Sequence, residues 1–302
     1  MVQKLIGAKA SVIRKMTKRE LLISIKESEG RVVLSESTAA ESSLLKNVTG
    51  AEMSRAFGAD MVLLNDFNAK FPKIAGLCDE ESDSKKINSP KEIINLLKDY
   101  IGIPVGANID SLVEPVIPYS SLENREVVNP FLEAQEIGLD FIVLTGNPET
   151  GVTNKAIEKN ISVAKKYFEG IIIAGKMHRS GVDEQIINLK IVEKFINAGA
   201  DIIMLPAVGS FYGIGNEKIR EIVEYTHYKG KLVMSAIGTS QESCHPEVIR
   251  NIAIQNKILG VDIQHIGDSN MGLSGYENIK EMSEAIRGKS YTLARIVQSI
   301  NR

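Results

Sequence analysis

The segment IIIAGKMHRSGV (171–182) places a lysine, a histidine and an arginine directly after an apolar run. Three isoleucines in a row are typical of a strand that is buried on both faces. A lysine at a strand end can act as a Schiff-base nucleophile or stabilise an enolate, and a histidine transfers protons near neutral pH. Side chains two residues apart share a strand face, so Lys176 and His178 should point the same way if the strand stays extended. The alternative is that Lys176, His178 and Arg179 belong to a solvated basic turn that leads to the next helix.

Carboxylates follow other apolar runs of the chain, at Glu36, Asp66, Asp110 and Asp268. Hard oxygen ligands of this kind suit Mg²⁺ or Mn²⁺, and a carboxylate can also act as a general base. We therefore predict that Glu36, Asp66 and Asp110 are catalytic, and that Glu36, Asp66 and Asp268 bind the metal. The alternative is that these carboxylates form salt bridges with the basic cluster at 176–179.

Two later loops, AIGTSQES (236–243) and HIGDSNMGLSG (265–275), combine glycines with hydroxyl side chains. Glycines let backbone N–H groups approach an anion, and hydroxyls add donors. The sequence predicts a phosphate site there, formed by Gly238, Thr239, Ser240, Gly267, Asp268 and Ser269. In the same run Gln264 and His265 are neighbours, so they face opposite sides of a strand. If Gln264 faces the interior of the sheet, His265 packs beneath a helix.

One sequence pattern recurs four times and indicates the fold that must position these residues. It consists of Gly, a small or apolar residue, Asp and an apolar run, and it begins at Gly58, Gly138, Gly199 and Gly260. Four further apolar runs lie between the copies, beginning at Arg31, Ile103, Gly170 and Lys231. Helical patterns, such as those at 154–168 and 184–198, separate most of the eight runs. Strictly alternating strands and helices form a parallel sheet.

We therefore predict an α/β protein with a (β/α)8 TIM barrel, whose chemistry lies at the carboxyl ends of its strands. The repeated Asp lies at the opposite, stability-bearing end and is expected to be structural. A doubly wound sheet is the alternative, but its Gly-rich first turn is missing. We expect residues 1–30 to form an N-terminal helical extension, 31–287 the barrel and 288–302 a C-terminal helix packed on it. The charged segment 67–86 is expected to be a mobile lid.

Composition excludes several other classes of protein. The 302 residues carry a formal net charge of −2, without the basic excess of a nucleic-acid binder. The N-terminus lacks the apolar core of a signal peptide, and no apolar stretch approaches the roughly 18 residues of a membrane span. The chain has only two cysteines, which is typical of a reducing compartment. We expect a cytoplasmic protein with no nucleic-acid partner and no membrane span, and we leave open a homo-oligomer.

Four segments carry a family resemblance: SEGRVVLSE, AFGADMVLLNDFN, GLDFIVLTGNPETGVTN and IIIAGKMHRSGV. They resemble, over nearly the whole chain, an uncharacterised bacterial family of phosphate-binding-type TIM barrels often labelled haloacid dehalogenase-like hydrolases. The LTGNPETG segment is also similar to a loop of the BtpA-like barrels, which are associated with photosystem I biogenesis. A haloacid dehalogenase needs an Asp-x-Asp motif after its first strand, where this chain has Ser-Glu-Ser (35–37), so the resemblance implies the barrel and not that activity.

The residues and the fold together predict an enzyme that acts on a small anionic, phosphorylated metabolite. We expect lyase, aldolase or isomerase chemistry, with Lys176 as nucleophile or charge stabiliser and His178 beside it. A metal-assisted hydrolase that uses the same carboxylates is one alternative. A barrel that binds a ligand or a partner without turnover, as the BtpA-like resemblance implies, is the other.

Overall fold

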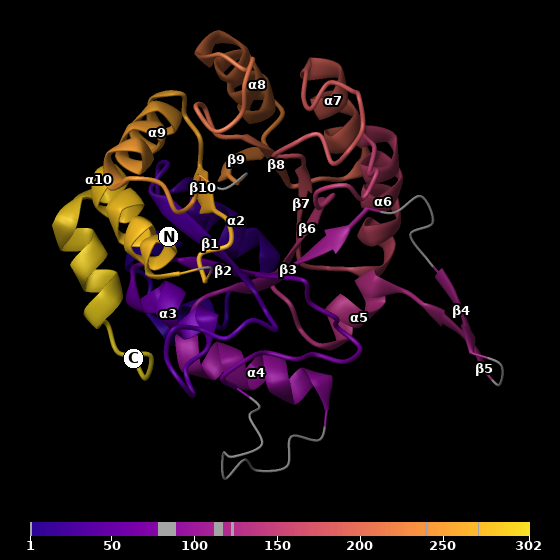
Figure 1. Ribbon diagram of the computed structural model, residues 1–302, viewed down its shortest axis with the longest axis horizontal. Helices are drawn as coiled ribbons and strands as arrows, with labels where there is room; N and C mark the ends of the chain where they lie inside the picture. Colours follow the sequence, from indigo (N-terminus) through magenta and orange to yellow (C-terminus); the bar gives the residue numbers. More distant parts are fainter. Residues whose placement is uncertain (1, 78–88, 112–116, 122–123, 239–240, 271) are drawn as a thin grey trace.

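The computed structural model is a closed eight-stranded parallel barrel surrounded by helices (Figure 1). It describes residues 2–77, 89–111, 117–121, 124–238, 241–270 and 272–302, with backbone alone at 117–121 and 124–128. Around the barrel, the strand order is β1-β10-β9-β8-β7-β6-β3-β2, and every neighbouring pair is parallel. The predicted (β/α)8 barrel is therefore confirmed. Its strands are β1 (Val32–Thr38), β2 (Met61–Asn65), β3 (Val105–Asp110), β6 (Phe141–Thr145), β7 (Ile171–Gly175), β8 (Ile202–Pro206), β9 (Leu232–Ile237) and β10 (Ile263–Ile266).

Helices connect successive strands, and their ends match local sequence signals. Ser89 accepts a hydrogen bond from the Glu92 N–H at the start of α4, and Thr17 forms a capping box with Glu20 at the start of α2. The helices are α1 (Ala10–Ile13), α2 (Lys18–Lys26), α3 (Gly50–Ala56), α4 (Pro90–Ile101), α5 (Pro130–Glu136), α6 (Asn154–Tyr167), α7 (Leu189–Ala198), α8 (Asn216–Tyr228), α9 (Pro246–Ile258) and α10 (Leu273–Val297), and a 3-10 turn covers Leu5–Gly7.

Two features depart from plain strand–helix alternation. Strands β4 (Ile117–Ser121) and β5 (Asn124–Val128) form a separate antiparallel pair between β3 and α5, which the apolar pattern did not indicate. Helix α10 is interrupted at Gly288, whose φ of 78° is not helical, at the boundary expected for a C-terminal helix. Of the expected lid 67–86, residues 78–86 lie outside the described residues, and the lid stays a prediction.

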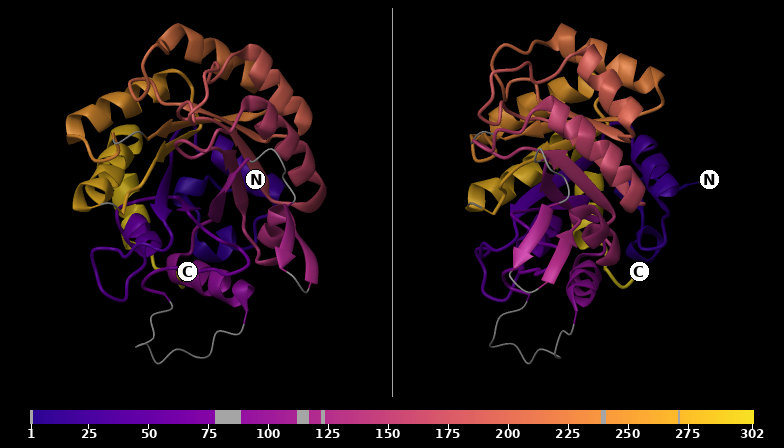
Figure 2. Two further views of the ribbon diagram at one scale, coloured as in Figure 1. Left: turned by 45° about the vertical axis from the view of Figure 1, so that its right-hand side comes forward. Right: turned by 90° about the vertical axis from the view of Figure 1, so that its right-hand side faces the viewer.

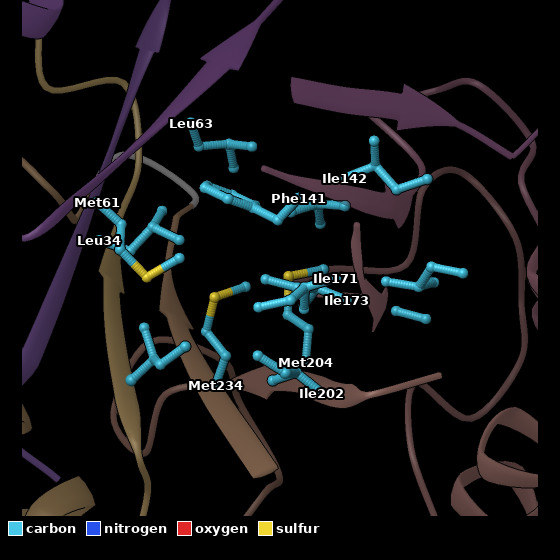
Figure 3. Close-up of a cluster of buried hydrophobic side chains, with 14 of the residues drawn as sticks. Leu34, Met61, Leu63, Phe141, Ile142, Ile171, Ile173, Ile202, Met204 and Met234 are labelled. Atoms are coloured by element: carbon cyan, nitrogen blue, oxygen red, sulfur yellow. The ribbon is translucent and has the colours of Figure 1, made fainter. Parts of the chain in front are cut away.

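Apolar side chains fill the lower part of the barrel. Figure 3 shows Leu34, Met61, Leu63, Phe141 and Met234 among the buried side chains there, and each is at most 1% exposed. At Gly106 a Cβ would lie 2.3 Å from the Phe141 ring, so the glycine makes room for that ring. The interior is a packed core, and only its upper end is available for chemistry.

The repeated Asp joins strands at the amino-terminal end of the barrel in the same way four times. The carboxylates of Asp60, Asp140, Asp201 and Asp262 accept hydrogen bonds from the first or second N–H group of the neighbouring strands, at 2.8–3.0 Å. Each of these aspartates also returns its own N–H to the same neighbour's carbonyl. The N-terminal segment lies at this end, where Lys18 contacts Asp201 at 2.6 Å (Figure 2). The structural role predicted for the repeat therefore has a physical basis.

Candidate active site

Glu36 lies at the centre of a polar layer above the apolar core. Its carboxylate accepts a hydrogen bond from Asn108 Nδ2, and its other oxygen lies 2.8 Å from His265 Nε2. Asn108 Nδ2 also contacts Asn65 Oδ1 at 3.1 Å. The Glu36 and His265 side chains are 4% and 0% exposed. The His265 N–H does not point straight at the oxygen, so this contact is mainly electrostatic. Strands β3 and β10 thus place two polar side chains on the carboxylate of β1, and β2 adds Asn65 beside Asn108.

His265 faces the barrel interior, contrary to one of the two orientations considered for it. Gln264 Nε2 donates to the Ala253 carbonyl of α9, so Gln264 faces the helices. Alternation then turns His265 inward, onto Glu36. The condition under which His265 would pack beneath a helix, an inward-facing Gln264, is therefore not met.

The glycine and serine after β10 support the position of Glu36. A Cβ at Gly267 would lie 3.1 Å from the Ile237 carbonyl oxygen and 3.3 Å from Glu36 Oε2, so a larger residue would crowd both the strand and the carboxylate. Ser269 donates both its N–H and its hydroxyl to the Glu36 carbonyl, at 2.9 and 2.8 Å, and its hydroxyl also contacts Ser35. These contacts fix the backbone of β1 to the loop that follows β10.

A cavity of about 440 Å³ lies at the carboxyl ends of the strands, above Glu36. Its lining combines several carboxylates with a histidine and an arginine. The residues are Glu36, Asn65, Thr145, Gly146, Asn147, Pro148, Glu149, Met177, His178, Arg179, Ser180, Gly181, Gly238, Glu242, Gly267 and Asp268. The expected position of the chemistry, at this end of the barrel, therefore coincides with a cavity.

His178 lines this cavity, whereas Lys176 does not. Strand β7 ends at Gly175, and the chain bends at residues 177–178. The Lys176 side chain is fully buried, and its ammonium contacts Glu184 at 2.6 Å. The expectation that Lys176 and His178 share the mouth is therefore wrong. Arg179 lines the cavity and contacts Asp183 at 3.1 Å.

Burial lowers the pKa of His178, and the nearby Lys176 ammonium lowers it further, although Glu36 and Asp110 act in the opposite direction. His178 is therefore neutral at neutral pH. Its Nδ1 accepts a hydrogen bond from the Ser180 N–H at 3.1 Å, so the neutral ring carries its proton on Nε2. Ser180 holds a φ of 54° and donates its hydroxyl to the Gly146 carbonyl. The ring is thus a positioned neutral hydrogen-bond donor.

Two further carboxylates, Asp268 and Glu242, lie close to Glu36. Burial raises the pKa of Asp268, and the Glu36 charge raises it further. Burial also raises the pKa of Glu242, with contributions from Asp268 and Glu36. The sequence analysis did not select Glu242, although it lies within the 236–243 loop, because only the glycines and hydroxyls of that loop were considered. We call Glu36, Glu242 and Asp268 the acidic side of the cavity.

Two of the predicted catalytic carboxylates do not line the cavity. Asp66 is exposed, with a φ of 48°, and Asn65 takes the inward position at the end of β2. The expected place of Asp66 in the mouth is therefore wrong. Asp110 accepts hydrogen bonds from the N–H and side chain of Asn147, at 2.8 and 3.3 Å, and so positions a residue of the lining.

The described residues supply few free hydrogen-bond donors for the predicted phosphate site and no set of ligands for the predicted metal site. Ser269 gives its donors to the barrel, the Gly267 N–H bonds the Ile237 carbonyl, and Thr239 and Ser240 lie outside the described residues. The phosphate site stays a prediction. Among the residues that the structure describes, no three His, Cys, Asp or Glu side chains gather closely enough to hold a metal ion. The expected set of Glu36, Asp66 and Asp268 therefore does not fit Mg²⁺ or Mn²⁺.

A family model described as "Domain of unknown function (DUF7916)" matches residues 6–302, and the chain belongs to that family. This agrees with the expected uncharacterised barrel family, and the matching model is neither a haloacid dehalogenase nor a BtpA model. No curated protein matches the chain. Within the described residues, no helix has the length and apolar character needed to cross a membrane.

Solved structures of enzymes resemble the chain at low sequence identity. Thiamine phosphate pyrophosphorylase from Pyrococcus furiosus is 13% identical, with 85% of this chain and 96% of that chain covered and a TM-score of 0.48. Phosphonopyruvate hydrolase, solved in complex with oxalate and Mg²⁺, is 15% identical, with coverages of 84% and 81% and a TM-score of 0.48. The carboxyl transferase domain Y628A of Rhizobium etli pyruvate carboxylase, solved with pyruvate, is 11% identical; coverages are 97% and 53%, and the TM-score is 0.52. These likenesses concern the fold alone.

Proposed function

We propose that this DUF7916 protein is an enzyme that transfers a proton at a carbon next to a carbonyl group of a small anionic metabolite. Such a step belongs to isomerase or lyase chemistry. The observation that carries the proposal is the Glu36 carboxylate, buried at the base of a cavity and held by Asn108 and His265. A carboxylate fixed in this way is preorganised to act as a general base.

The proposed roles follow from which side chains reach the cavity. Glu36 lines it and takes the proton, whereas His265 and Asn108 are positioning residues that hold the Glu36 carboxylate. His178 follows β7, which lies opposite β1 in the barrel order. Its Nε2–H is suited to donate to the substrate carbonyl oxygen, where negative charge develops. Proton removal on one side of the cavity and charge stabilisation on the other then act on one substrate.

Arg179 supports an anionic substrate group. It lines the cavity next to His178 and carries the positive charge that a carboxylate or a phosphate needs. A phosphorylated metabolite, as predicted from the sequence, therefore places its phosphate toward Arg179 in this proposal. The loops after β9 and β10 are not used for it.

The proposal uses neither a Schiff base nor a metal ion. Lys176 is paired with Glu184 behind the lining, and the described part of the lining contains no lysine. We therefore expect borohydride, added with candidate keto acids, to trap no covalent adduct on Lys176. An adduct at that residue would favour the aldolase alternative.

The test is hydrogen exchange in deuterated water. The protein is incubated with small keto acids, hydroxy acids and their phosphorylated analogues, and deuterium uptake at carbon is measured by mass spectrometry. We expect exchange with at least one compound, and Glu36→Gln should slow it about 10²–10⁴-fold, the usual contribution of a general base. Thermal melting of the variant is the control for folding. Unchanged exchange in a folded Glu36→Gln protein would refute the role of Glu36.

A further inference from the structure

We propose that the substrate of this site also carries a protonated amine, which binds on the acidic side of the cavity between Asp268 and Glu242. The inference rests on the proposed function, because it concerns the same cavity. It makes the substrate zwitterionic, with its anionic group toward Arg179 and its ammonium group toward Asp268 and Glu242.

The first support is charge. Four carboxylates line the cavity, and Arg179 is the single Lys or Arg among the described lining residues. Within the described part of the chain, neither Asp268 nor Glu242 has a lysine or arginine within 4.0 Å, whereas Glu36 contacts His265. Burial and the neighbouring carboxylates raise the pKa of both groups, although His265 acts in the opposite direction on both and a hydrogen bond from Asn65 does so on Asp268. A bound cation would stabilise the ionised form of both carboxylates.

The second support is independent of these charges, and it comes from buried polar atoms without hydrogen-bond partners. Thr145 lines the cavity and is 2% exposed, and its hydroxyl has no hydrogen-bond partner among the described residues. Asn108, which holds Glu36 from outside the lining and is 8% exposed, likewise leaves Oδ1 without a donor from the described residues. Buried polar atoms of this kind usually find partners, and here a ligand is the missing one. An ammonium group fits because it has three donors and no acceptor, while the two carboxylates need donors.

Geometry favours an ammonium group over a metal ion. Magnesium requires its ligands at about 2.0–2.1 Å in octahedral geometry, and Ca²⁺ requires several oxygens at about 2.3–2.6 Å. In the described residues no three carboxylate, histidine or cysteine side chains converge in this way. An ammonium group reaches acceptors at about 2.7–2.9 Å in three directions, so it tolerates carboxylates that come from separate loops. Asp268 follows β10, and Glu242 lies in the loop after β9.

The test compares binding of matched small molecules to the full chain by calorimetry. The probes are 4-aminobutyrate, its hydroxyl analogue 4-hydroxybutyrate, the dicarboxylate glutarate, and MgCl₂ alone. We expect 4-aminobutyrate to bind at least roughly tenfold more tightly than 4-hydroxybutyrate, because only the amine compensates the acidic side. Asp268→Asn and Glu242→Gln should each reduce that preference to about threefold or less. Asp66→Asn is the matched control, because Asp66 also follows a barrel strand at positive φ but is exposed and outside the lining, so this variant should retain the preference.

Several outcomes would overturn the inference. These are equal binding of the amine and the hydroxyl analogue, tighter binding of glutarate, no binding of any organic probe, or binding of MgCl₂ alone. Loss of the preference for the amine in Asp66→Asn would also overturn it. The preference would then depend on the overall negative charge of the protein and not on Asp268 and Glu242. The two proposals can be refuted independently. If hydrogen exchange occurs only with substrates that lack an amine, the zwitterionic substrate is refuted and the proton transfer stands. If the amine probe binds but no compound shows exchange, the proton transfer is refuted and the ammonium site stands.

Discussion

The repeated aspartates allow a sharp test of what stabilises the barrel, because one of them is far more buried than another. Asp60 is fully buried and contacts two buried guanidinium groups, those of Arg287 and Arg295, as well as the Val33 N–H. Asp140 makes the same strand contact, to the Val105 N–H, but its side chain is 33% exposed and its partner Lys98 is 20% exposed. Asp60→Asn and Asp140→Asn therefore make the same chemical change in two environments.

We expect Asp60→Asn to lower the free energy of unfolding by about 3–5 kcal/mol, because it leaves two buried guanidinium charges without their counter-ion. The asparagine oxygen can still accept the Val33 N–H, so the strand contact itself contributes little to the difference. Asp140→Asn should cost about 1 kcal/mol, since water screens a partly exposed pair. At about 2 °C per kcal/mol, the melting temperature should fall by about 6–10 °C in the first variant and by about 2 °C in the second.

Far-ultraviolet circular dichroism is the suitable assay, because the chain contains no tryptophan. Thermal melts and urea titrations of the wild type and of both variants give the comparison, with hydrogen exchange of the variants as a check on the barrel end that is distant from the cavity. Equal losses in the two variants would refute the reasoning, because the burial of the Asp60 network would then have no energetic consequence. A stable Asp60→Asn protein would refute it as well.

Three further predictions concern titration and packing. Lys176→Met should raise the pKa of His178 toward its ordinary value, because a nearby positive charge is removed. Proton NMR of the ring should show the increase. An unchanged pKa would mean that the Lys176 ammonium does not act on the His178 ring. The hydrogen bond to Asp262 raises the pKa of His227, so its stabilisation is fully present below the unfolded value of about 6.5 and is lost as pH rises through the folded value. Replacing His227 with Gln should therefore destabilise the protein more near pH 5.5 than near pH 9 in paired melts, and the reverse order would contradict this sign. Gly267→Ala should displace Glu36 and slow exchange in a protein that still melts cooperatively, whereas full exchange would show that the carboxylate tolerates the methyl group.

The sequence alone determined the barrel, because its evidence is local and repeated. Apolar runs of strand length alternate with helical periodicity, and the helix at 90–101 begins where Ser89 and Pro90 predict. The Gly-x-Asp repeat likewise marked the amino-terminal end of the strands, since each copy stands directly before an apolar run. Once the direction of each strand was known, the carboxyl ends of the strands could be predicted as the location of the active site.

Only the tertiary structure decided which polar residues meet in the cavity. A shift of one residue exchanges the two faces of a strand, so the sequence could not tell His265 from Gln264 or Asn65 from Asp66. Lys176 lies just beyond the end of β7, where the chain bends at 177–178, and its ammonium pairs with Glu184 instead of entering the cavity.

The contacts of Glu36 have the same origin. Asn108 and His265 are distant from Glu36 in the chain and reach it only because the closed barrel brings β3 and β10 toward β1. A pattern along one strand carries no information about such partners. The sequence therefore determined that polar groups gather at this end of the barrel, and closure of the sheet decided which of them contact one another.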